Sequence, residues 1–320
     1  MKILIIVLRA VGDVLLTTPL IRALKKSNPT NEIYFLTGNS AKKILKYNPY
    51  LSGIISCDKD TLEKIRTQKF DTVIDFMHSA ISGYWTLFSG AKKRIAFYRP
   101  WGFWCYNIMP RYVDKGYTVY DRLQILDAIG IKDDGMEMDL IFSDENEKKV
   151  LEFFDKNKIS KQDFLVTFDI TNRRVYRQWQ KGKFSQLADL LAEKYNAKII
   201  FLWGPGELDY VQSAMSLCKK QHILCDNFDL LELTALIKNC RLHIGTSSAP
   251  GRIAVSQKTP TFIIYGMKNN ACGWQSPESI HGYIQGDLEN LSTTEVFNKL
   301  FMQQKSSGFM KKSTGKYETT

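Results

Sequence analysis

Short apolar runs alternate with longer stretches of helical periodicity along the first half of the chain. Residues 3–8 are continuously apolar, which is typical of a strand buried on both faces of a parallel sheet. Residues 14–26 then place Leu16, Leu20 and Leu24 at helical spacing, with Pro19 within the first turns. Further strands are expected at 33–36, 53–57, 71–76 and within 91–97, and helices at 41–47, 62–68 and 121–129. This alternation predicts a doubly wound sheet.

The second half repeats the pattern after a charged amphipathic stretch at 144–160, which predicts a connecting helix. Strands are expected at 165–168, 198–203, 223–225, 242–245 and 261–265, and helices at 184–195, 208–218, 230–238 and 250–256. Asp229 with Glu232, and Ser292 with Glu295, have the spacing of capping boxes. The chain therefore predicts an α/β protein with two Rossmann-like halves and a ligand crevice between the carboxyl ends of their sheets. We expect domains at 1–158 and 159–304, followed by a basic, flexible tail at 305–320.

The composition narrows the possible partners. The 320 residues carry a formal net charge of +11, which favours anionic partners such as a phosphorylated small molecule, an anionic membrane surface or nucleic acid. The six cysteines form no C-x-x-C pair, which argues against a disulfide framework or a zinc site and fits a reducing cytoplasm. No apolar run reaches the length of a membrane span. Asp58-Lys-Asp60 resembles a D-x-D metal motif, but Asp60 is better explained as a helix N-cap, so we expect no metal and no cofactor.

The stretch from Arg241 to Ala254 combines features of a phosphate-binding turn. It predicts a strand, a turn of small residues and a helix that begins at or near Pro250. Gly245 and Gly251 would let a ligand approach the backbone, and Ser247 or Ser248 would cap the helix. The first turn of such a helix presents unbonded N–H groups to an anion. The alternative interpretation is an ordinary strand-to-helix turn of an α/β protein.

Residues 91–111 are basic and aromatic. Lys92, Lys93 and Arg94 precede a stretch, Tyr98 to Tyr106, in which five of nine residues are aromatic. One interpretation is a loop packed over the sheet with a solvated basic face. The other is an acceptor platform or a membrane-surface contact, where aromatic rings lie beside cations.

Several fragments occur in the order and register of one family. In the first half these are Arg9-x-x-Gly12-Asp13 through Pro19, then 70–75, 91–97 and 126–130. In the second half they are Arg177-Gln-Trp179, 202–207, 244–254 and 260–266. The ordered set resembles glycosyltransferase family 9, the family of ADP-heptose:lipopolysaccharide heptosyltransferases, over about residues 1–300.

The resemblance implies a GT-B fold, in which two Rossmann-like domains face each other across a substrate cleft. The N-terminal domain would bind the acceptor and the C-terminal domain the nucleotide-sugar. The implied reaction is the inverting transfer of a sugar, heptose from ADP-heptose, to a lipopolysaccharide-core or other anionic glycan acceptor. The implied setting is cytoplasmic, with peripheral contact to an anionic inner membrane and no nucleic-acid partner.

The resemblance also implies roles for individual residues. Asp13 would be the general base that deprotonates the acceptor hydroxyl, although an N-cap role would explain it as well. Arg177 would neutralise the leaving diphosphate, and Glu207 would hold the donor ribose or, alternatively, stabilise a helix start. Further donor-binding candidates are Gly12, Thr171, Thr246, Ser247, Ser248, Ala249, Pro250 and Arg252. Acceptor-binding candidates are Lys93, Arg94, Arg99 and Trp101.

The sequence departs from the family pattern in the phosphate-binding turn. Ser247 stands where the family has Asp, Ala249 where it has Gly, and Arg252 where it has His. The turn becomes more positive, which leaves open a different nucleotide-sugar, a differently held ADP-heptose or an inactive member. A dinucleotide-dependent oxidoreductase is disfavoured because residues 9–13 lack G-x-G-x-x-G. A non-catalytic nucleotide- or nucleic-acid-binding protein has only the net charge in its favour.

Overall fold

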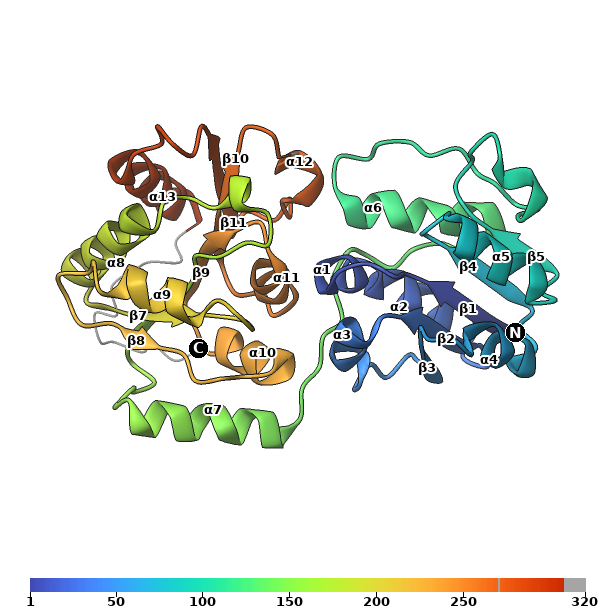
Figure 1. Ribbon diagram of the computed structural model, residues 1–320, viewed down its shortest axis with the longest axis horizontal. Helices are drawn as coiled ribbons and strands as arrows, with labels where there is room; N and C mark the ends of the chain where they lie inside the picture. Colours follow the sequence, from blue (N-terminus) through green and yellow to red (C-terminus); the bar gives the residue numbers. More distant parts are fainter. Residues whose placement is uncertain (270, 308–320) are drawn as a thin grey trace, which may run out of the picture. The chain divides into compact units, whose positions relative to one another are not determined.

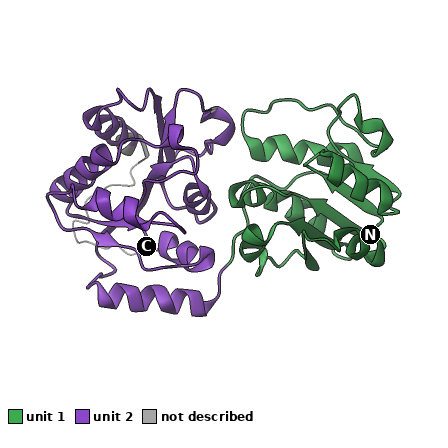
Figure 2. Cartoon of the chain, in the orientation of Figure 1, with its two compact units in different colours: residues 1–141 green, residues 142–320 purple. Residues whose placement is uncertain are grey.

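The computed structural model describes residues 1–269 and 271–307. The chain divides into two compact units, Met1–Ile141 and the part from Phe142 onward, which we call unit 1 and unit 2 (Figure 2). Each unit contains a parallel sheet with helices, so the prediction of two Rossmann-like halves is confirmed. Among the described residues, no helix combines the length and the apolar character that crossing a bilayer requires.

Unit 1 is built on a five-stranded parallel sheet of order β3-β2-β1-β4-β5 (Figure 1). Its strands are β1 (Lys2–Ile6), β2 (Glu32–Thr37), β3 (Gly53–Ser56), β4 (Thr72–Asp75) and β5 (Lys93–Ile95). Its helices are α1 (Val11–Leu15), α2 (Thr18–Ser27), α3 (Asn39–Lys42), α4 (Thr61–Gln68), α5 (Ala80–Phe88) and α6 (Thr118–Leu123). Short 3-10 turns are η1 (Lys43–Leu45), η2 (Gly102–Trp104) and η3 (Gln124–Ile129).

Unit 2 is built on a six-stranded parallel sheet of order β11-β10-β9-β6-β7-β8. Its strands are β6 (Phe164–Asp169), β7 (Ala197–Leu202), β8 (Ile223–Leu224), β9 (Leu242–Thr246), β10 (Thr261–Gly266) and β11 (His281–Gly286). Its helices are α7 (Asp144–Lys156), α8 (Lys181–Tyr195), α9 (Leu208–Met215), α10 (Leu230–Lys238), α11 (Ala249–Ser256), α12 (Ala271–Trp274) and α13 (Thr293–Ser307), with the 3-10 turn η4 (Val175–Arg177).

The strand order places one switch point in each sheet. In unit 1 the connections run from β1 outward through β2 and β3, then return to β4 on the other side of β1. Unit 2 does the same from β6, with β9 on its other side. Adjacent loops leave such a pair of strands in opposite directions, and open α/β sheets bind ligands at the carboxyl ends of these strands. Ligand sites are therefore expected at the carboxyl ends of β1 and β4 in unit 1, and of β6 and β9 in unit 2.

The long helix expected at 14–26 is two helices in the structure. α1 ends at Leu15, and α2 begins at Thr18 with Pro19 in its first turn. Because Pro19 has no N–H to continue the preceding helix, it suits the start of a new one. The hydroxyls of Thr17 and Thr18 donate to the carbonyls of Asp13 and Leu15, which stabilises the break.

The boundary between the units falls after Ile141, whereas the sequence predicted it after residue 158. The helix α7 belongs to unit 2 because it packs on α10 and the turn before it. The rings of Phe153 and Phe228 lie 5.4 Å apart, and Lys149 pairs with Glu232 at 2.6 Å. At the other end α13 continues to Ser307, so the tail predicted from 305 begins inside a helix, and 308–320 lie outside the described residues.

The predicted helix caps have mixed outcomes. The capping box of Asp229 and Glu232 is confirmed at the start of α10, and Ser292 and Glu295 bond reciprocally at α13. Asp60 occupies the N-cap position of α4, but its side chain makes no capping hydrogen bond. Asp58 pairs with Lys64 instead of offering a carboxylate beside Asp60.

Two buried histidines link neighbouring strands of unit 2. His243 on β9 shares a hydrogen bond of 3.1 Å with Thr167 on β6, and His281 on β11 shares one of 3.2 Å with Thr261 on β10. Burial lowers the pKa of His243 to about 3 and that of His281 to about 4. Below the ordinary histidine pKa the unfolded chain therefore takes up protons that the folded chain does not, and stability falls as the pH falls.

We predict a pH-dependent difference between the wild type and His243→Gln, which keeps a polar partner for Thr167. Below about pH 6.5 the wild type should lose about 1.4 kcal/mol per pH unit relative to the variant. Urea unfolding of both proteins at several pH values measures this difference. Because the two proteins share every other titrating group, the difference reports the histidine alone. Between pH 7 and 8 the difference should be constant. Parallel stability curves down to pH 5 would contradict the assignment.

Candidate functional site

In unit 1 the carboxylate of Asp13 is held by Arg122. Asp13 is the third residue of α1, directly after β1, and Arg122 comes from α6. One guanidinium nitrogen lies 2.8 Å from Asp13 Oδ1, and another donates to the backbone carbonyl of Asp13 and to the hydroxyl of Thr17. The N-cap of α1 is Ala10, so the N-cap interpretation of Asp13 is wrong.

The second oxygen of Asp13 is available for chemistry. Within the described residues, Oδ2 has no hydrogen-bond partner, and the side chain keeps 16% of its surface exposed. Burial lowers the pKa of Arg122 to about 10, which leaves the guanidinium charged at neutral pH. A carboxylate with one oxygen anchored by a cation and the other accessible can accept a proton from a correctly placed hydroxyl.

An aromatic contact path connects this pair to the basic, aromatic segment. The Arg122 guanidinium lies 5.7 Å from the ring centre of Phe76, which directly follows β4. Phe76 packs edge-on against Phe97, and Phe97 against Tyr112. The loop after β4 also contains His78, a non-glycine residue with φ of 45°, a backbone conformation that persists only where its surroundings impose it.

The four acceptor candidates do not all remain available. Arg94 uses its guanidinium to donate to the carbonyls of Cys105 and Ala91, at 2.9 and 3.1 Å, so it ties the loop that follows β5. Lys93 is exposed on the edge strand β5. Arg99 and Trp101 lie together, with the guanidinium 5.9 Å from the indole centre and the indole edge-on to His78. Arg99 and Trp101 form the cation–aromatic pair that the acceptor interpretation requires.

In unit 2 side-chain hydrogen bonds join the loop after β6 to the turn after β9. The hydroxyl of Thr246 donates to the carbonyl of Thr171 at 2.7 Å, and Asn172 donates to the carbonyl of Ser247 at 2.9 Å. The donor candidates Thr171, Thr246 and Ser247 are thereby brought together at the switch point between β6 and β9. Asn172 was not predicted, since nothing in the sequence distinguishes its side chain from other loop amides.

A buried carboxylate lies behind this turn. Asp169, the last residue of β6, accepts a hydrogen bond from the hydroxyl of Ser248. Burial is the main cause that raises the pKa of Asp169 to about 7, and the nearby Glu207 carboxylate adds to it. Ser248 occupies the N-cap position of α11, but its hydroxyl turns to Asp169 and makes no capping bond. Asp169 was not predicted; an acidic residue at the carboxyl end of an apolar strand is the sequence signal that could have indicated it.

The small residues of the turn serve packing between elements. A Cβ at Gly245 would lie 2.8 Å from the carbonyl oxygen of Asp169, and one at Gly251 would lie 3.0 Å from Ile263. The close approaches that these glycines permit are thus to β6 and β10, whereas the sequence interpretation assigned them to a ligand. α11 begins at Ala249 with Pro250 in its first turn, as predicted.

Two arginines beside the turn lack a carboxylate partner within the described residues. Arg177 lies in η4 with its guanidinium 5.6 Å from the ring centre of Tyr176, and its buried Nε has no hydrogen-bond partner there. Arg252, one turn into α11, is buried with its guanidinium 5.4 Å from the indole centre of Trp274. Neither takes part in a salt bridge in this part of the chain, so both retain charge for an anion.

Glu207 lies at the start of α9, after the turn that follows β7. It occupies the N-cap position without making a capping bond, and its Oε2 accepts the N–H of Gly204 at 2.8 Å. This hydrogen bond fixes the turn and leaves Oε1 without a partner in the described chain. The carboxylate is therefore oriented and half-buried, as a residue that binds vicinal hydroxyls needs to be.

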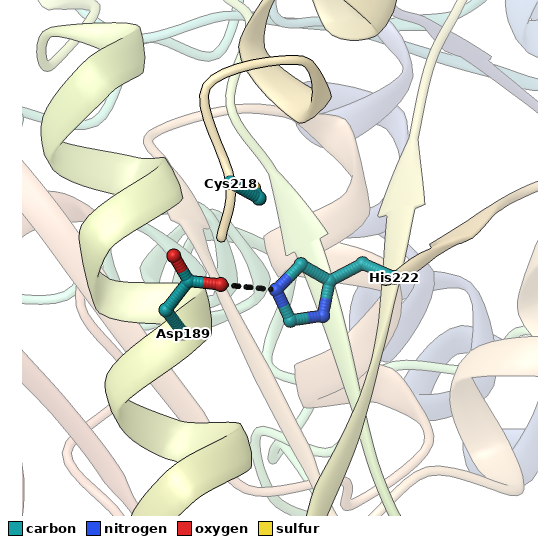
Figure 3. Close-up of side chains that lie close together, drawn as sticks. All are labelled: Asp189, Cys218 and His222. Atoms are coloured by element: carbon teal, nitrogen blue, oxygen red, sulfur yellow. Dashed lines mark hydrogen bonds and ion pairs between the residues drawn. The ribbon is translucent and has the colours of Figure 1, made fainter. Parts of the chain in front are cut away.

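In the part of the chain that the structure describes, one group of side chains has the donor types of a metal site. Asp189, Cys218 and His222 offer atoms within 4.8 Å of one another (Figure 3). However, both oxygens of Asp189 already accept hydrogen bonds, from the backbone N–H groups of Lys219 and Lys220, and one also accepts from His222 at 3.1 Å. These bonds account for the cluster as an anchor for the connection between α9 and β8.

Comparison with known proteins gives a consistent result. A family model described as glycosyltransferase family 9 (heptosyltransferase) matches residues 60–276. Lipopolysaccharide heptosyltransferase 3 of Escherichia coli K12 is 26% identical over 309 residues, which cover 90% of this chain and 89% of that protein. The lipopolysaccharide core heptosyltransferase OpsX of Haemophilus influenzae is 23% identical over 280 residues, or 82% of this chain and 78% of that protein.

Solved structures share the fold. A family 9 glycosyl transferase from Veillonella parvula matches with a TM-score of 0.86 and 20% identity, over 95% of this chain and 97% of that one. E. coli heptosyltransferase WaaC with ADP matches with a TM-score of 0.76 and 14% identity, over 97% of this chain and 100% of that one. These likenesses confirm the GT-B fold class predicted from the sequence.

We predict that removing the guanidinium of Arg122 destabilises unit 1. Arg122→Met keeps the apolar stem but leaves the Asp13 carboxylate unpaired, which should lower the free energy of unfolding by about 2 to 3 kcal/mol. Arg66→Met, at an exposed arginine of α4, is the matched control and should stay within about 0.5 kcal/mol of the wild type. Chemical denaturation measures both. Equal effects of the two substitutions would show that the Asp13–Arg122 pair does not stabilise the fold.

Proposed function

The chain belongs to glycosyltransferase family 9, and we propose that it transfers a heptose from ADP-heptose to a lipopolysaccharide-core or related anionic glycan. The named relatives, lipopolysaccharide heptosyltransferases, support this choice of donor and acceptor class. The observation that carries the proposal is the Asp13 carboxylate, anchored on one oxygen by Arg122 and open on the other. We place the reaction in the cytoplasm, which suits six cysteines that are all unpaired thiols.

The proposed chemistry in unit 1 is general-base catalysis. Asp13 Oδ2 takes the proton of an acceptor hydroxyl while the hydroxyl oxygen attacks the anomeric carbon. The C–O bond to the nucleotide breaks on the opposite side, so the configuration at the anomeric carbon inverts. Arg122 holds Oδ1, and its bonds to the Asp13 carbonyl and to Thr17 keep the carboxylate on the first turn of α1. Gly12 precedes it without adding a side chain to this surface.

The leaving diphosphate requires positive charge as the glycosidic bond breaks. We assign this to Arg177, to Arg252 and to the N–H groups of the first turn of α11, because neither arginine pairs with a carboxylate in the described chain. The turn residues Thr246, Ser247, Ser248, Ala249 and Pro250 line the diphosphate in this scheme, with the hydroxyl of Thr171 beside them. No metal ion or other cofactor enters the proposed reaction.

The nucleoside part of the donor is assigned to Glu207. Its free Oε1 can accept hydrogen bonds from the vicinal ribose hydroxyls while Gly204 holds Oε2. Ser247 replaces the family's aspartate, but the same turn has a carboxylate next to it, because the hydroxyl of Ser248 donates a hydrogen bond to Asp169. We therefore retain ADP-heptose as the donor. The alternative, another nucleotide-sugar, is favoured by Arg252, whose buried cation stands where the family has histidine.

We predict that ADP and ADP-heptose raise the melting temperature more than UDP or GDP do. At about 100 times its dissociation constant, a ligand specific for the folded state adds about 2.7 kcal/mol of stability. Glu207→Gln should weaken ADP binding about tenfold or more, because it loses charge-assisted hydrogen bonds to the ribose. Asp209→Asn, two residues on and exposed in the first turn of α9, is the matched control and should bind as the wild type does.

Other outcomes of the same titration are equally informative. Stabilisation by UDP or GDP alone would keep the transferase and reassign its donor to another nucleotide-sugar. A chain that responds to none of these nucleotides would contradict the assignment of the donor site to the turn after β9.

A further inference from the structure

The segment from Phe76 to Val113 has an unusual composition. Its 38 residues include eleven aromatic and five Lys or Arg side chains, and none is Asp or Glu. Elsewhere the chain mixes both signs of charge, since it contains 33 acidic residues in all. A long stretch that is cationic, aromatic and free of carboxylates predicts a surface that meets an apolar and anionic environment.

The helix α5 in this segment turns large apolar side chains to the outside. Ile81, Tyr84 and Phe88 are 51%, 47% and 49% exposed and follow one another at spacings of three and four, so they share one face. The opposite face contains Trp85 and Thr86, which are buried against the sheet. An amphipathic surface helix normally places its polar face outward, and α5 does the reverse.

The turn η2, beside α5, carries two further exposed aromatic side chains. Phe103 and Trp104 are 58% and 72% exposed, and their rings lie 4.8 Å apart. The turn lies beside α5, because a Cβ at Gly83 would be 3.1 Å from Cys105 Sγ. Hydrogen bonds hold it there: Tyr106 donates to Asp75 at 2.6 Å, and Arg94 donates to the carbonyl of Cys105. These hydrogen bonds fix the backbone that carries the exposed rings.

The same segment carries exposed cations. Lys92 and Lys93 are exposed on the connection from α5 into β5, and neither takes part in a salt bridge with a described residue. Arg99 follows in the next loop, with its guanidinium beside Trp101. The surface thus combines insertable aromatic side chains with unneutralised positive charge, which is the complement of anionic headgroups over acyl chains.

We propose that this surface, formed by Ile81, Tyr84, Leu87, Phe88, Phe103 and Trp104 with Lys92 and Lys93 of the same segment, docks unit 1 onto an anionic lipid bilayer. The aromatic and aliphatic side chains enter the headgroup region, and the lysines contact lipid phosphates. The inference rests on the proposed function only for its purpose, which is to bring a lipid-borne acceptor to Asp13. Within the same segment, Phe97 contacts Phe76, and Phe76 contacts the Arg122 guanidinium that holds this carboxylate.

Vesicle flotation tests the docking without any acceptor present. The full chain should float with vesicles of phosphatidylcholine and phosphatidylglycerol and bind vesicles of phosphatidylcholine alone much less. The double variant Phe103→Ser and Trp104→Ser should reduce binding roughly tenfold or more. The control is Leu217→Ser, which removes a side chain of similar exposure, 54%, from unit 2. Lys92→Gln should weaken binding to the anionic vesicles about fivefold and leave the weak binding to phosphatidylcholine unchanged.

Activity separates this inference from the proposed reaction. With a delipidated, soluble acceptor the double variant should turn over at the wild-type rate. With acceptor embedded in anionic vesicles, its rate should fall by the same factor as its vesicle binding falls in flotation. Anionic vesicles that bind the double variant and the wild type equally would overturn the docking while leaving the transferase intact. Concentration-dependent dimerisation that disappears in the double variant, without vesicle binding by the wild type, would also overturn it and assign the face to a second copy of the chain.

Discussion

The parallel pairing of β1 with β4 and of β6 with β9 is the constraint on which the two sites depend. Parallel strands end at the same edge of a sheet, so residues that are far apart in sequence meet where the connections diverge. Arg122 reaches Asp13 across 109 residues, and Ser248 reaches Asp169 across 79. The Asp13 carboxylate and the turn after β9 are held by these long-range contacts, whereas Glu207 is held locally by Gly204.

The charges at the carboxyl ends of the two sheets differ. At the end of β1 a carboxylate is paired with one buried guanidinium and keeps one open oxygen, an arrangement suited to accepting a proton. After β6 and β9, Arg177 and Arg252 form no salt bridge with a described residue, and the buried Asp169 carboxylate, whose pKa is raised, lies behind the turn. Positive charge without a carboxylate partner suits a diphosphate, so the charge distribution supports the different roles proposed for the two units.

The alternation of apolar runs was sufficient to predict the fold class and most strands. Of the elements with more than four residues, α5 and β11 were not predicted. The helix α5, Ala-Ile-Ser-Gly-Tyr-Trp-Thr-Leu-Phe, exposes its apolar residues and buries small residues beside Trp85, so it lacks the polar outer face that marks an amphipathic surface helix. The strand β11 is a partly exposed edge strand with two glycines and no apolar run. In both cases the environment, and not the pattern of the segment, decides the structure.

Motifs in the sequence supplied part of the candidate site. Asp13, Glu207 and the turn from Thr246 to Pro250 followed from the family resemblance. Their partners Arg122, Asp169 and Asn172 did not, because each acts through a long-range hydrogen bond that no spacing reveals. Arg94 was predicted to bind acceptor because it is basic, but its guanidinium binds backbone carbonyls of its own loop.

The most direct test of the account is the rate of heptose transfer from ADP-heptose by Asp13→Asn, compared with the wild type. The substitution keeps an oxygen for Arg122 but removes the base, so kcat should fall roughly 10²- to 10⁴-fold while ADP still stabilises the protein. Asp127→Asn, at an exposed carboxylate of the same unit, should transfer at the wild-type rate. The wild-type product should have the inverted anomeric configuration. Turnover by Asp13→Asn at the wild-type rate would contradict the central claim.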